Sequence, residues 1–125
     1  MRQFENVISD KGSKYAVSGA AVADPDEAKV FLRNLKRKKK YGRATHNSWA
    51  ALFRGERDEL VRVKNDDGEG GAGNVILRSL EREGLEGHII VVTRWYGGVR
   101  LGGDRFRHVQ SCVRYYLDHW RTIDE

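Results

Sequence analysis

A short apolar run near residue 90 decides how the rest of the chain can be arranged. Residues Ile89 to Val92 are all β-branched and follow one another without interruption. This pattern is typical of a central strand that is buried on both faces of a sheet. The run is far shorter than the roughly 20 apolar residues that a membrane-spanning helix needs. We therefore predict a soluble domain built around a sheet, with residues 88–93 as an interior strand.

The patterns before this strand predict two β-hairpins. Residues 4–9 and 14–22 both favour strands, and the turn signal Asp10 to Gly12 separates them. Residues 47–54 and 59–64 form a second such pair, which turns at Gly55. Strands that come in hairpins make a mostly antiparallel sheet.

Three amphipathic segments predict helices beside the sheet. Asp24 precedes Pro25, and Glu27 follows three positions later, which is the signature of a reciprocal helix cap. That helix ends near Gly42, a second runs to Gly84, and a third begins at Asp104 as its N-cap. With 125 residues, the chain has room for one core. We expect a single α+β domain over residues 1–125.

The net charge of +5 is unevenly distributed, because Lys and Arg outnumber Asp and Glu only in residues 1–64. Seven cations lie close together at the end of the first helix. They could steer a polyanion such as RNA, or simply form a solvated helix end that suits the helix dipole. The seven are Arg33, Lys36, Arg37, Lys38, Lys39, Lys40 and Arg43.

The single cysteine and the start of the chain indicate where the protein works. Cys112 cannot form an internal disulfide, which agrees with a reducing compartment. The first residues contain no apolar core of an export signal. We expect a cytoplasmic protein.

Three polar segments are candidates for a functional site. The first is Ala44 to Asn47, where His46 could be a general base, an anion donor or a structural hydrogen-bonding group. The second, Asn65 to Gly73, places carboxylates before a helix, where they could cap free amides or hold a divalent cation. Its spacing differs from that of a calcium-binding loop.

The third polar segment, Thr93 to Arg105, combines glycines, arginines and aromatic residues. Glycines let backbone amides approach a ligand, arginines bind phosphate or carboxylate, and Trp95 and Tyr96 could stack on a base. The alternative is a strained turn with two core aromatic residues. No Gly-Lys-Ser/Thr follows the glycines, so the segment is not a phosphate-binding P-loop.

We predict that these segments converge on one surface, because each lies at the end of a strand or helix. In the alternative, Arg94 pairs with Asp66 or Asp67 only to tie two loops together. No nucleophile with its base can be identified, and we predict no catalytic residue, metal or cofactor. The predicted ligand-binding residues are His46, Asn47, Asp66, Asp67, Glu69, Arg94, Tyr96, Gly97, Gly98, Arg100 and Arg105.

The order and spacing of these segments resemble the IMPACT family, including its YigZ-like members. The resemblance rests on KGSKY at Lys11 to Tyr15, ATHN at Ala44 to Asn47, NDDGE at Asn65 to Glu69, VVTRWYGG at Val91 to Gly98 and LGGDRFRH at Leu101 to His108. It implies an α+β fold like ribosomal protein S5 domain 2, with helices on one face of the sheet. It also implies a link to translation, since eukaryotic members restrain the amino-acid-starvation kinase that phosphorylates initiation factor 2.

Three functions follow as hypotheses. The first is a non-enzymatic, translation-associated regulator that binds RNA or a ribosome-linked partner through the Gly/Arg-rich loop. The second, implied by the resemblance, is a protein-binding negative regulator of the starvation-kinase pathway, with Trp95 and Tyr96 as interface anchors. The third is a phosphate-processing enzyme in which Asp66, Asp67 and Glu69 hold Mg²⁺ and His46 is the base.

Overall fold

A computed structural model describes residues 1–121, so the last four residues of the predicted domain lie outside the described part. The chain forms an α+β fold with an antiparallel sheet, which confirms the predicted class. The elements are β1 (Arg2–Asp10), β2 (Ser13–Ala21), α1 (Pro25–Arg37), α2 (Lys39–Gly42), β3 (His46–Arg54), β4 (Leu60–Asn65), α3 (Ala72–Glu83), β5 (His88–Trp95) and α4 (Asp104–His119).

The sheet has the strand order β1-β2-β5-β3-β4, with β5 in the centre. β1 pairs with β2 and β3 pairs with β4, as the two predicted hairpins require. β5 lies between the hairpins and pairs with β2 on one side and β3 on the other. Every residue of β5 from His88 to Arg94 is buried, which confirms the predicted interior strand.

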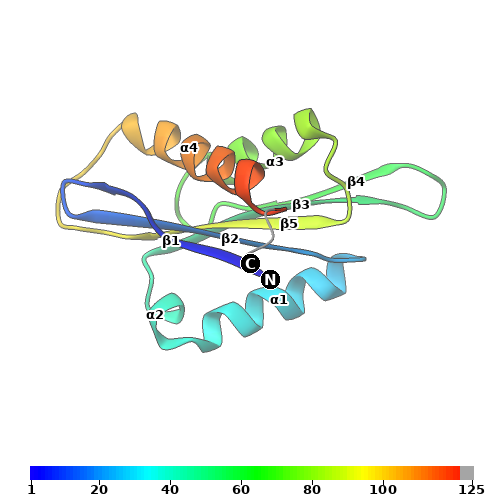
Figure 1. Ribbon diagram of the computed structural model, residues 1–125, viewed down its shortest axis with the longest axis horizontal. Coiled ribbons are helices and arrows are strands. Elements are labelled where there is room, and N and C mark those ends of the chain that lie inside the picture. Colours follow the sequence, from blue (N-terminus) through cyan, green and yellow to red (C-terminus); the bar gives the residue numbers. More distant parts are fainter. Residues whose placement is uncertain (122–125) are drawn as a thin grey trace.

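Helices cover both faces of this sheet. Figure 1 shows α3 and α4 on one side and α1 with α2 on the other. Successive side chains of a strand point to opposite faces, so Ile90 and Val92 join the core beneath α3 and α4. Ile89 and Val91 join the second core, beneath α1 and α2. The expectation of helices on one face is therefore wrong, because a strand that is apolar on both sides needs cover on both.

The start of α1 follows its predicted sequence signal. The predicted end of this helix near Gly42 is wrong, because Lys38 is extended and separates α1 from α2. The Asp24 side chain accepts a hydrogen bond from the Glu27 amide at 2.9 Å, and Glu27 accepts one from the Ala23 amide at 2.7 Å. This is the predicted reciprocal cap, with the difference that Glu27 binds the amide one residue before the N-cap. At α4, however, the N-cap is Gly103 and no side chain caps the helix, so the predicted capping role of Asp104 is wrong. The helical turn starts earlier, since the Asp104 amide donates to Leu101 O at 3.2 Å.

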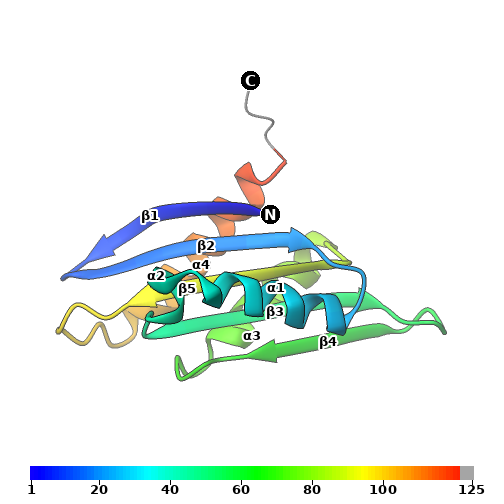
Figure 2. The same ribbon diagram turned by 90° about the horizontal axis from the view of Figure 1, so that it is seen from below.

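Three connecting segments gather at one end of the sheet. The β1–β2 turn, α2 and the loop between β5 and α4 lie at the same end in both views (Figures 1 and 2). Within residues 1–121, every helix is too short or too polar to cross a bilayer. The gathered end contains most of the residues singled out in the sequence.

Candidate functional site

A buried ion pair links the acidic loop to the central strand. Arg94, near the end of β5, donates from Nη1 to Glu69 Oε1 at 2.9 Å and to Oε2 at 3.2 Å. The exposed fractions of the two residues are only 6% for Arg94 and 2% for Glu69. Arg94 Nη2 also lies 3.4 Å from Ser13 Oγ at the start of β2. The alternative pairing of Arg94 with Asp66 or Asp67 is wrong, since the partner is Glu69.

The two aspartates of the acidic loop hold backbone amides. The Asp66 carboxylate accepts hydrogen bonds from the amides of Gly71 at 3.0 Å and Gly73 at 2.7 Å. These bonds hold the pKa of Asp66 below its usual range and satisfy amides at the start of α3. The Asp67 carboxylate accepts from the Asn47 amide at 2.7 Å, which fixes the loop to β3. Helix capping, one of the two roles considered for this loop, is what Asp66 performs.

His46 and Asn47 complete a network that joins the three polar segments. His46 Nδ1 lies 2.8 Å from the carbonyl oxygen of Asp67, so this nitrogen carries the proton and donates. His46 Nε2 lies 3.5 Å from Glu69 Oε2. The Asn47 side chain donates to Tyr41 O at 3.0 Å and accepts from the Thr93 hydroxyl at 2.8 Å. The structure thus brings these predicted residues together, while their role in ligand binding stays a prediction.

The carboxylates of this network already have protein partners. Asp66 binds amides of α3, Asp67 binds an amide of β3, and Glu69 binds Arg94. Within residues 1–121, no group of three or more His, Cys, Asp or Glu side chains could hold a metal ion. The interactions of these carboxylates therefore give the Mg²⁺-dependent enzyme hypothesis no support.

The Gly/Arg-rich loop is fixed at its base and exposed at its tip. The Gly97 amide donates to Ser13 Oγ at 3.2 Å, and a Cβ on Gly97 would lie 2.0 Å from the carbonyl carbon of Gly12. Only glycine permits this close approach. Beyond it, Tyr96, Gly98 and Arg100 face solvent. Arg105 lies nearer the ion pair, with its Nη1 4.0 Å from Glu69 Oε1.

The basic segment packs against the start of this loop. The Trp95 indole donates from Nε1 to the carbonyl oxygen of Lys40 at 2.9 Å, and Lys40 Nζ lies 5.3 Å from the Trp95 ring centroid. All seven cations of residues 33–43 are exposed. Among the described residues, Lys40 is the one member of the seven that forms an ion pair, with Glu5 at 3.1 Å. The basic segment therefore contacts the start of the Gly/Arg-rich loop, and we call these two segments together the basic end.

A small cavity at the basic end includes residues that the sequence did not single out as a site. Its volume is about 360 Å³, and its lining residues are Asn6, Lys14, Lys40 and Trp95. Lys14 and Trp95 lie directly opposite each other in the pairing of β2 with β5. The one feature of the sequence that could have identified Lys14 as a site residue is its outward position in a strand of alternating polarity.

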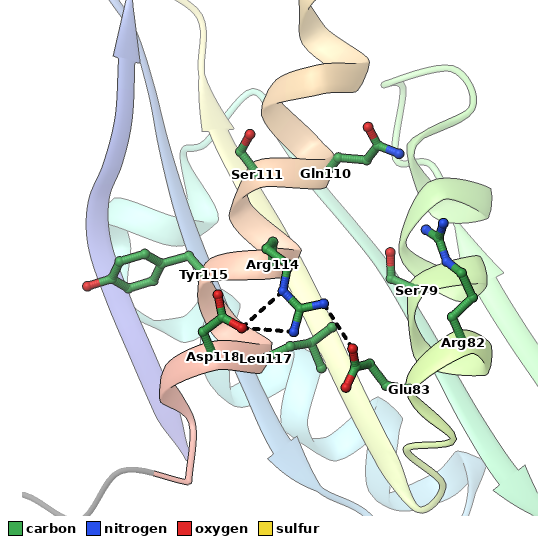
Figure 3. Close-up of a pocket in the computed structure, with 9 residues that line it drawn as sticks. All are labelled: Ser79, Arg82, Glu83, Gln110, Ser111, Arg114, Tyr115, Leu117 and Asp118. Carbon is green, nitrogen blue, oxygen red and sulfur yellow. Dashed lines mark hydrogen bonds and ion pairs between the residues drawn. The ribbon is translucent and has the colours of Figure 1, made fainter.

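A larger cavity of about 620 Å³ lies between α3 and α4, away from all the predicted residues. Figure 3 shows Arg114 between Glu83 and Asp118, which it contacts at 2.9 Å each. The charges of this groove are therefore largely neutralised in pairs. Its lining residues are Ser79, Arg82, Glu83, Gln110, Ser111, Arg114, Tyr115, Leu117 and Asp118.

Comparisons with known proteins show that the sequence matches a known family. The sequence model described as the Impact N-terminal domain matches residues 11–117. "Protein IMPACT" of Xenopus laevis is 36% identical over 122 residues, which cover 94% of this chain and 39% of that protein. The chain therefore spans well under half the length of this relative.

Two solved structures resemble the fold. One, described as the crystal structure of a hypothetical protein, has a TM-score of 0.79 and 26% identity, and the match covers 94% of this chain and 57% of the other. The second is described as the two-domain translational regulator Yih1. It has a TM-score of 0.60 and 29% identity over 93% of this chain and 44% of the other.

Proposed function

The chain belongs to the Impact N-terminal domain family, and from this premise we propose that it is a non-enzymatic regulator of translation that binds RNA through its basic end. A relative of known structure is described as a translational regulator, which supports the biological setting. Binding of RNA is the molecular activity that we infer for the surface itself.

One observation carries this proposal, namely the contact between Lys40 and Trp95. This contact joins the cluster of exposed cations in residues 33–43 to the Gly/Arg-rich loop, which is far away in the sequence. Lys38, Lys39 and Arg43 contribute from one side and Arg100 from the other, all of them exposed. Unpaired cations on one surface release counterions from a polyanion when it binds, so they favour RNA irrespective of its sequence.

The test is a salt titration of RNA binding, followed by fluorescence anisotropy with a labelled structured RNA. Phosphate contacts predict a linear fall of log K with log salt concentration, with a slope of roughly −0.7 to −0.9 for each contact. The double substitution Lys39→Glu and Arg43→Glu should weaken binding by about tenfold or more and flatten this slope. A salt-independent affinity would contradict the proposal.

The matched control places the same change of charge on the other face of the sheet. Arg78 and Arg82 are exposed residues of α3, opposite the face that α1 and α2 cover. The substitutions Arg78→Glu and Arg82→Glu alter net charge equally, so they should leave RNA binding close to that of the wild type. Equal losses in the two double variants would show that net charge, and not the basic end, determines binding.

A second candidate is binding of a protein partner, as in the proposed regulation of the starvation-kinase pathway. It is favoured by the exposed apolar side chains of Tyr96 and Val99, whose exposed fractions are 49% and 47%. Aromatic residues at an exposed loop tip can anchor an interface. Affinity capture from starved cells would separate the two candidates, because retention of a kinase activator after ribonuclease treatment would favour the protein-binding role.

A further inference from the structure

The β1 strand bulges away from β2 where it borders the cavity at the basic end. Phe4 pairs with Val17 and Ile8 pairs with Tyr15, so three residues of β1 lie opposite Ala16 alone. Asn6, in the middle of the bulge, has a φ of 54°, a left-handed conformation that asparagine tolerates better than most residues. The bulge leaves Asn6 exposed at the rim of the cavity.

The opposite wall of the cavity is an aromatic ring in a fixed position. The hydrogen bond from Trp95 Nε1 to Lys40 O holds one edge of the indole, and Tyr41 contacts it at an interplanar angle of 67°. Tyr41 in turn donates to Glu5 Oε2 at 2.6 Å, which connects α2 to the bulged strand. A ring held in this way loses little conformational freedom when a flat ligand stacks on it.

Two polar groups of the cavity have no interaction partner among residues 1–121. The Lys14 ammonium makes no ion pair there, although it lies beside Trp95 on the same face of the sheet. The Asn6 side-chain amide makes no hydrogen bond there either. An amide offers both a donor and an acceptor, as the edge of a nucleobase does, and a lysine is suited to phosphate.

We propose that this cavity binds one nucleotide of single-stranded RNA. In this arrangement the exposed Lys40 side chain, whose Nζ lies 5.3 Å from the Trp95 ring centroid, swings aside and the base stacks on the ring in its place. The Asn6 amide hydrogen-bonds to the edge of the base, and Lys14 contacts the phosphate. The inference rests on the proposed function and narrows it, since a base inside a duplex is already stacked and cannot reach the indole. The volume of about 360 Å³ is near the lower end of the roughly 300–1,000 Å³ usual for ligand pockets, and this size suits a single nucleotide.

The experiment uses the full chain with two labelled RNAs, an oligoadenylate of eight nucleotides and a blunt-ended duplex. Trp95→Leu removes the aromatic face but keeps an apolar side chain of moderate size. It should weaken oligoadenylate binding by roughly ten- to hundredfold and leave duplex binding within about twofold of the wild type. Lys14→Gln and Asn6→Ala should weaken oligoadenylate binding by smaller factors in the same direction.

Tryptophan fluorescence gives a second measurement that does not depend on how well Trp95→Leu folds. Oligoadenylate should quench the fluorescence of the wild type and of the control Trp120→Phe. In Trp95→Phe the ring is kept, so binding should persist while the quenching disappears. Quenching that persists in Trp95→Phe, or unchanged oligoadenylate affinity in a folded Trp95→Leu protein, would overturn the single-nucleotide site.

Failure of the inference is distinguishable from failure of the proposed function. If the wild type binds both RNAs in a salt-dependent manner but the Trp95 variants behave like the wild type, only the cavity assignment is wrong. If the wild type binds neither RNA, the proposed function is wrong and the inference falls with it. Polyglutamate that competes as well as oligoadenylate and quenches Trp95 equally would instead indicate an acidic peptide as the occupant, which also overturns the inference.

Discussion

Replacing Glu69 with Ala should destabilise the protein far more than removing an exposed acidic partner. Glu69 is buried, and its carboxylate receives the Arg94 guanidinium at 2.9 Å. Arg94 is also buried, and its Nε has no hydrogen-bond partner among the described residues. Without Glu69, a positive charge would remain in a desolvated site with nothing to balance it.

The expected loss is about 3–5 kcal/mol in the free energy of unfolding, which is the usual result of breaking a buried pair from one side. For a domain of this size each kcal/mol lowers the melting temperature by roughly 3–5 °C, so we expect a drop of about 10–20 °C. Urea unfolding followed by circular dichroism measures the change directly. The midpoint should fall while the dependence on urea concentration stays constant.

Two variants make the argument refutable. Glu86 pairs with Arg54 at 2.6 Å on the exposed surface, so Glu86→Ala should move the midpoint only slightly. Replacing both buried partners, as in Arg94→Met with Glu69→Leu, should restore much of the stability, because no unpaired charge remains. If Glu69→Ala is as mild as Glu86→Ala, the Glu69–Arg94 pair is not desolvated.

Three further predictions concern pH and close packing. Burial, and to a lesser degree Arg121, lowers the pKa of His88 to about 4, below its ordinary 6.5. As the pH falls, the unfolded chain therefore binds this proton before the folded protein does. Roughly 3 kcal/mol in the free energy of unfolding should be lost between about pH 6.5 and about pH 4. Urea titrations at each pH measure this loss, which His88→Gln should abolish. The Asp66 pKa is also lowered, so its contribution is present above about pH 4 and is lost in stronger acid. Asp66→Asn should remove this acid dependence and lower stability by about 1 kcal/mol near pH 7, measured by the same titration. Gly97→Ala should lower stability by about 1–3 kcal/mol in thermal unfolding, because its Cβ would meet the Gly12 backbone. The control Gly103→Ala should be nearly neutral, because the space around Gly103 is open. Equal effects of the two substitutions would contradict the close contact at Gly97.

The elements that the sequence predicted well depend on neighbours in the chain. The β-branched run at residues 89–92 and the Asp24 cap act over a few residues, and both lie where expected. The same run also indicates helices on both faces of the sheet, because a strand that is apolar on both faces needs cover on both. The family resemblance implied helices on one face only. The break between α1 and α2 was missed, because nothing in the basic run marks the extended conformation of Lys38.

The partners within the site could not be predicted, because they depend on the path of one loop. Asp67 and Gly68 both adopt positive φ, of 47° and 85°, and the Glu69 amide bonds back to Asp66 O at 3.0 Å. This tight turn places Glu69 in the interior beside Arg94 and leaves Asp67 facing β3. From the sequence alone, Asp67 would have been an equally reasonable partner for Arg94. The cavity at the basic end likewise depends on the register between β2 and β5, which the sequence does not specify.

The central position of β5 has a consequence for how the protein folds. Each hairpin, β1–β2 and β3–β4, can form from neighbouring residues, but a two-stranded hairpin is marginally stable in water. The strand that joins them comes after both in the chain. The pairing of β2 with β5 closes a loop from residue 21 to residue 88. Because this contact is so distant in the sequence, we expect the domain to fold more slowly than a helical bundle of similar size. During synthesis, the two hairpins must therefore remain unjoined until β5 has left the ribosome, and a chain truncated before residue 88 should expose both apolar faces and aggregate.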